Sequence, residues 1–154
     1  LVKKVLIVDL DVHQGNGTAE IFQNDTSVFT FSMHGKGNYP FKKEQSDLDI
    51  ALENDTNDET YLSILKDILP KLINDEKPDF IYYLCGVDVV ASDKLGKLGM
   101  TLEGCKERDQ FVLQTCKNNK IPVMCSMGGG YSPDIKIIIE AHANTFRLAQ
   151  EIFF

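Results

Sequence analysis

The feature that most constrains the fold is the alternation of apolar, β-branched segments with longer segments of helical periodicity. Four segments are predicted to be strands: residues 2–9, 27–33, 80–85 and 122–127. Four are predicted to be helices, residues 18–25, 58–76, 102–119 and 133–154, and residues 34–57 are predicted to be a polar loop. Strands that alternate with helices form a parallel sheet with helices on both faces. The sequence therefore predicts a three-layer α/β/α fold with a mainly parallel sheet.

Two prolines affect the predicted helices. Within residues 58–76 the apolar side chains share one side, and Asn57 or Asp58 is expected to cap this helix. Pro70 is expected to kink or divide the helix, because proline cannot donate the backbone hydrogen bond. Pro133 is expected in the first turn of the last helix, where that donor is not needed.

The composition argues against several classes of function. A formal net charge of -7 disfavours a nucleic-acid-binding surface but tolerates cationic partners such as lysine-rich tails or polyamines. No apolar run approaches the length needed to cross a membrane. The four cysteines show no C-x-x-C spacing, so they are interpreted as reduced core residues of a cytoplasmic protein.

Polar side chains gather where the predicted strands end. Asp9, Asp11 and His13 follow the first strand at intervals of two, and such side chains point the same way on an extended backbone. Two carboxylates and an imidazole on one edge are costly unless a cation lies among them. Gly86–Asp88 and Gly128–Tyr131 follow later strands, and ligands collect at the carboxyl ends of parallel strands.

Asp11, His13 and Asp88 suit a catalytic zinc ion, because two carboxylates and one imidazole leave a coordination position open. The alternatives are that Asp11 caps the following helix and that Asp88 lies in a solvated turn. Dinucleotide binding is poorly supported, because Glu20 occupies the position of the third glycine in G-x-G-x-x-G.

Tyr131 follows three glycines and has two interpretations. It either packs in a tight turn or directs its hydroxyl into the site, where a phenol can stabilise an oxygen that becomes negative. Amide hydrolysis also requires a general base, usually histidine. The other two histidines are His34 and His142, and neither is singled out by its neighbours.

Four successive blocks resemble the zinc-dependent histone deacetylase family. They are "DLDVHQGNG" (9–17), "FSMHGKGNYP" (31–40), "CGVDVVASDKLGKLGMT" (85–101) and "GGGYSPDIKIII" (128–139). Asn16, the segment "LEGCKERDQ" (102–110) and the final helix are similar to the class IV branch. The resemblance covers essentially the whole chain and implies the arginase/deacetylase fold.

The resemblance implies a role for each matching residue. Zinc, or alternatively ferrous iron, would bind Asp11, His13 and Asp88, while Tyr131 would polarise the scissile carbonyl and Asp9 would orient a catalytic histidine. Structural potassium would bind at two sites, the first formed by Asp9, Asp11, His13, Ser32 and Met33, the second by Phe22, Asp25 and Val28. Tyr39 and Leu95 would line the channel for the acylated lysine, with Gly129 at its floor.

The implied substrate is the acylated lysine of a protein or an acylated polyamine. Family members carry a His-His pair upstream of the block that starts at Asp9, and one of these histidines is the base; the sequence has no such pair. Residues 1–154 are therefore expected to be the C-terminal half of a single deacetylase domain. We expect these residues to lack the N-terminal part of the sheet, to need the missing half of the domain as a partner and to be inactive alone.

Two other functions are alternatives to deacetylation. A non-catalytic module that binds zinc and an acyl-lysine is the main alternative. A ureohydrolase of the arginase type is disfavoured, because Gly15 stands where a second-metal aspartate would be needed. Phe41 is a further departure from the deacetylase pattern, because relatives often have glycine there, and it is expected to alter the channel rim.

Overall fold

A computed structural model describes residues 1–154 and contains one five-stranded sheet. The strands are β1 (Val5–Asp9), β2 (Val28–Gly35), β3 (Leu48–Leu52), β4 (Phe80–Gly86) and β5 (Val123–Gly128). Their order is β3-β2-β1-β4-β5, and every neighbouring pair is parallel. β1 lies in the middle of the sheet, so its side chains are almost all buried. Its carboxyl end lies between those of β2 and β4.

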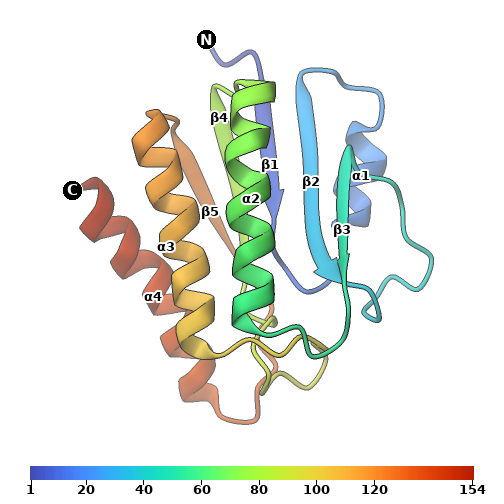
Figure 1. Ribbon diagram of the computed structural model, residues 1–154, viewed down its shortest axis with the longest axis vertical. Coiled ribbons are helices and arrows are strands. Elements are labelled where there is room, and N and C mark those ends of the chain that lie inside the picture. Colours follow the sequence, from blue (N-terminus) through green and yellow to red (C-terminus); the bar gives the residue numbers. More distant parts are fainter.

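Helices cover both faces of the sheet, as Figure 1 shows. They are α1 (Asn16–Phe22), α2 (Asp58–Glu76), α3 (Leu102–Asn119) and α4 (Ile135–Phe153). α2 and α3 lie in front of the sheet, α1 lies behind it, and α4 packs beside α3. The predicted α/β fold with a parallel sheet is confirmed. None of the helices combines the length and the apolar character that crossing a membrane requires.

The core lies between the sheet and the helices α2 and α3. It joins Leu6 and Val8 of β1 to Leu65 and Leu69 of α2 and to Val112 of α3. Full burial of each such side chain contributes about 1.5–3 kcal/mol to folding. All four cysteines are free thiols, and all but the partly exposed Cys125 are buried.

β3 lies inside the segment that the sequence predicts as a loop, and this prediction was wrong. Leu48–Leu52 pairs with residues Phe31–Gly35 of β2. The strand is short, lies at the sheet edge and is mostly half-buried, so it lacks the apolar run that marks the other strands. α1 also begins at Asn16 instead of residue 18 and ends at Phe22 instead of residue 25.

The predicted division of α2 at Pro70 and the predicted place of Pro133 inside the last helix are both wrong. α2 is continuous through Pro70, because Leu69 and Leu72 anchor both sides of the proline in the core while Pro70 itself is exposed. Asn57 caps α2 as expected, since its side chain accepts a hydrogen bond from the Thr60 backbone N at 3.1 Å. Pro133 precedes α4 rather than lying in its first turn, because Asp134 is the N-cap.

Candidate metal centre

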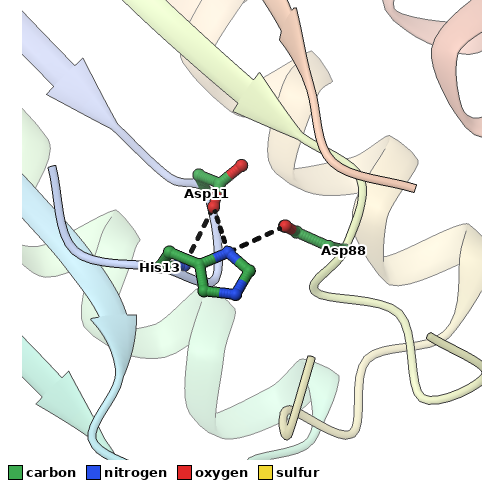
Figure 2. A group of neighbouring side chains, drawn as sticks. All are labelled: Asp11, His13 and Asp88. Carbon is green, nitrogen blue, oxygen red and sulfur yellow. Dashed lines mark hydrogen bonds and ion pairs between the residues drawn. The ribbon is translucent and has the colours of Figure 1, made fainter. Parts of the chain in front are cut away.

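Asp11, His13 and Asp88 meet at the carboxyl edge of the sheet (Figure 2). Asp11 and His13 follow β1, and Asp88 follows the adjacent strand β4. His13 Nδ1 lies 3.0 Å from Asp11 Oδ1 and 3.2 Å from Asp88 Oδ2. One potential ligand atom from each residue lies within 4.8 Å of the other two. The parallel register therefore brings together side chains that are more than seventy residues apart in sequence.

Backbone hydrogen bonds orient both carboxylates. Asp11 Oδ1 accepts from the His13 N at 2.9 Å, and Asp88 Oδ1 accepts from the Val12 N at 3.0 Å. The second bond crosses from the loop after β4 to the loop after β1. Each carboxylate is thus held by a backbone donor and also retains a lone pair for a cation.

Neither alternative interpretation of the two aspartates agrees with the structure. The N-cap of α1 is Gly15, and no side chain caps this helix, so Asp11 does not serve as its cap. Asp88 is 1% exposed, so it does not lie in a solvated turn. Both carboxylates instead face the same imidazole.

Two glycines make room for these carboxylates. A Cβ atom at Gly86 would lie 2.5 Å from Asp11 Oδ2, and one at Gly129 would collide with the carboxyl group of Asp88. Gly129 also has a φ of +65°, a conformation that other residues adopt at a cost. The backbone is therefore shaped around the carboxylates, and the donor set fits a divalent cation with three protein ligands.

The electrostatics of the cluster favour a cation. Hydrogen bonds to Asp11 and Asp88 raise the pKa of His13 to about 10. Burial raises the pKa of Asp9 to about 7 and also raises the pKa of Asp88. Buried carboxylates in such proximity need positive charge among them, which either a proton on His13 or a divalent ion bound to the neutral imidazole supplies.

The residues predicted to bind potassium fall in two groups. Asp9 accepts a hydrogen bond from the Asp11 N at 3.1 Å and pairs in register with the buried Ser32, which precedes the buried Met33. These residues therefore adjoin the candidate metal ligands. Phe22, Asp25 and Val28 line a separate pocket of about 410 Å³, together with Lys4 and others.

Two of the residues predicted to line the channel share a pocket with His13, a candidate metal ligand. Tyr39 and Leu95 lie with His13 around a hollow of about 250 Å³, and Phe41 lies on its exposed margin. Gly129 is not in this lining and instead contacts Asp88.

Tyr131 is 56% exposed, so it is not packed in the turn. Its backbone N donates to Asp93 Oδ2 at 2.6 Å, and Asp93 Oδ1 accepts from the N of Leu95 and of Gly96. Asp93 therefore links the backbone of Tyr131 to that of Leu95, a residue of the predicted channel. Sequence reasoning missed this role. The available signal was its fixed place in the block G-x-D-x-x-x-x-D-x-L-G.

The two other histidines of the chain are His34 and His142. His34 is buried, contacts Ser32 Oγ at 3.0 Å, and has its pKa lowered by burial. His142 is half-buried on α4, near the backbone of Gly130. Neither histidine is hydrogen-bonded to the carboxylate of Asp9. No histidine in the chain therefore stands in the place of an oriented general base.

A comparison with models of protein families identifies the family of this chain. A model of the "Histone deacetylase domain" matches residues 1–146. The chain belongs to the histone deacetylase family. The family expected from the four sequence blocks is thus confirmed.

Individual relatives agree with this assignment. The chain is 46% identical over 153 residues to an uncharacterized protein of Picosynechococcus sp., covering 99% of this chain and 51% of the relative. It is 28% identical to "Histone deacetylase 2" of Arabidopsis thaliana, covering 95% of this chain and 39% of the relative. The chain therefore spans about half, or less, of the length of these curated relatives.

Solved structures show the same fold, and this chain again covers about half of each matched chain. The HDA15 HD domain matches with a TM-score of 0.79 at 25% identity, over 97% of this chain and 46% of that one. An acetylpolyamine aminohydrolase from Burkholderia pseudomallei matches with a TM-score of 0.82 at 20% identity, over 98% and 46% respectively. The second likeness shows the fold alone.

Proposed function

We propose that the protein acts as a zinc-dependent deacetylase that hydrolyses the amide of an acylated lysine or a related acylated amine. The observation that carries this proposal is the cluster of Asp11, His13 and Asp88 at the carboxyl edge of the sheet in a chain of the deacetylase family. Three protein ligands with an open position are typical of catalytic rather than structural zinc.

The residues divide the chemical work. Asp11, His13 and Asp88 hold the ion, and zinc when bound polarises an acyl carbonyl and lowers the pKa of a water molecule. The hydroxyl of Tyr131 donates a hydrogen bond to the carbonyl oxygen as it becomes negative. Asp9 orients the histidine that removes the proton from water, and this base comes from outside residues 1–154.

The proposal includes a second half of the domain, upstream of Leu1, which supplies this base. The chain spans about half of its relatives. β5 is an edge strand, and it exposes Met124 and Met127. α4 also exposes Ile135 and Ile139, and apolar patches of this kind mark interaction surfaces. The isolated 154-residue chain is accordingly inactive.

The proposal also covers the class of substrate, the substrate channel and the branch of the family. The net charge of -7 suits a cationic substrate, either a lysine-rich protein segment or a polyamine. Tyr39 and Leu95 line the channel for the acyl group, with Gly129 at its floor beside Asp88, and potassium at the two predicted sites supports the strand ends. Class IV membership and a cytoplasmic location stay predictions.

Acetate release from an acetyl-lysine peptide and from an acetylated polyamine tests the proposal. The full gene product, reconstituted with zinc, is compared with the 154-residue chain. We expect turnover only by the full product. If the full product binds zinc but hydrolyses neither substrate, the deacetylase proposal is wrong, and a module that binds zinc and acyl-lysine without turnover is favoured.

A further inference from the structure

Arg108 is a buried arginine that reaches from α3 to the strand ends that carry the zinc ligands. Its side chain is 0% exposed. Nη1 donates two hydrogen bonds, to the carbonyl oxygen of Leu10 at 3.1 Å and to that of Gly86 at 2.7 Å. Leu10 directly precedes Asp11, and Gly86 lies two residues before Asp88. One nitrogen atom therefore joins the two backbone segments that present both carboxylate ligands.

This link lies just beyond the regular ladder between β1 and β4. The Leu10 N donates to the Leu84 carbonyl at 3.0 Å, and the Leu10 carbonyl then turns to Arg108. On the other strand the Val87 N donates to the Gly128 carbonyl at 3.0 Å. Arg108 thus holds the two loops together at the point where ladder bonds between these strands end.

The charge of Arg108 is balanced inside the core. Asp109 Oδ1 lies 2.9 Å from Arg108 Nε and 2.8 Å from Nη2, and Asp109 is itself fully buried. The hydroxyls of Tyr83 on β4 and Thr145 on α4 both donate to Asp109. A buried ion pair stabilises the fold little compared with apolar residues of similar volume. The position of the Arg108 guanidinium is therefore more informative about its role than its contribution to stability.

We propose that Arg108 is a positioning residue of the metal centre. Its guanidinium fixes the separation of the loops after β1 and β4, and so the separation of Asp11 and Asp88. This rests on the metal site of the proposed function. Lysine cannot do the same work, because its single nitrogen would have to serve both carbonyls and Asp109. Arginine divides these hydrogen bonds between two nitrogens held in one plane, with Nη1 on the carbonyls and Nε on Asp109.

The test compares Arg108→Lys with Arg147→Lys, a matched control on the surface of α4. In the full gene product, zinc affinity is measured by competition with a chelator, and the visible spectrum of the Co²⁺-loaded protein reports ligand geometry. We expect Arg108→Lys to bind zinc about 10- to 100-fold more weakly and to shift the Co²⁺ bands. Arg147→Lys should match the wild type in both readouts.

A second variant removes both buried charges. Arg108→Met with Asp109→Asn keeps the side-chain volume similar. The amide oxygen can accept from the Tyr83 hydroxyl, and the amide nitrogen can donate to the Thr145 hydroxyl. Zinc weakening and shifted Co²⁺ bands in every variant that folds support the proposal. Wild-type affinity and spectrum in a folded variant would overturn it. Loss of the fold in both variants would also overturn it, because Arg108 would then be needed for the core rather than for the metal centre.

Asp88→Asn separates this proposal from the proposed function. If Asp88→Asn loses zinc while Arg108→Lys keeps wild-type affinity, only the role of Arg108 is wrong. If Asp88→Asn also keeps wild-type affinity, the metal site itself is wrong, and the role of Arg108 fails with it.

Discussion

Gly129 shows how a residue without a side chain shapes the metal centre. We predict that Gly129→Ala weakens zinc binding by about 10-fold or more, since its Cβ would displace the Asp88 carboxylate and its φ of +65° would be strained. Chelator competition measures this effect. Gly17→Ala is the control, because a Cβ there meets nothing within 4 Å. Equal zinc affinity in Gly129→Ala and the wild type would contradict the prediction.

Tyr131 is the residue to which the account assigns stabilisation of the developing negative charge. We predict that Tyr131→Phe lowers kcat of the full gene product by roughly 10²- to 10³-fold, the loss typical of removing one oxyanion donor. Zinc should stay bound, because Tyr131 is not among the clustered ligands. Steady-state assays with an acetyl-lysine peptide measure kcat, and Tyr82→Phe, an exposed tyrosine of β4, is the control. Wild-type turnover by Tyr131→Phe would remove this role.

At the same scale, sequence reasoning predicted the cluster of candidate ligands but not the residues that support it. Asp11, His13 and Asp88 were recognisable because polar residues after apolar strands converge at one edge of a parallel sheet. Arg108 and Asp109 look like ordinary solvated charges on a helix. Their burial depends on Tyr83 and Thr145, which lie 26 and 36 residues from Asp109, and no local pattern encodes such contacts.

The helix α2 contains an internal proline at an exposed position. We predict that Pro70→Ala raises the free energy of unfolding by about 1–3 kcal/mol, because alanine restores a backbone donor and removes the steric conflict of the ring. Urea denaturation measures the change, with Lys71→Ala at a neighbouring exposed position as the control. A destabilised Pro70→Ala variant would mean that the proline ring makes a contact needed for the fold.

The strand β3 shows what sequence patterns miss at the scale of an element. Its side chains are mostly half-buried, so "LDIAL" has neither a long apolar run nor a strict alternation. Its position instead depends on side-chain anchors. Asp47 accepts from the N and hydroxyl of Thr30, and Asp49 accepts from Gln14. Predictions succeeded for the strands that carry an apolar run of their own.

The whole molecule exposes apolar side chains on β4, β5 and α4. We predict that Met124→Lys changes the stability of the 154-residue chain by no more than about 0.5 kcal/mol, because the side chain is already exposed. In the full gene product the same change should lower stability or activity, since the proposed upstream half covers this surface. The control is Ser63→Lys, at an exposed position of α2. An unaffected full product would contradict the proposed docking.

The zinc content of the protein tests the central claim most directly. The full gene product and its Asp88→Asn variant are dialysed to equilibrium against buffered zinc, and bound metal is measured per chain. Because Asp88 supplies a buried carboxylate to the cluster, the wild type should bind an equimolar amount of zinc and the variant much less. Equal zinc in both proteins, or none in the wild type, would contradict the account.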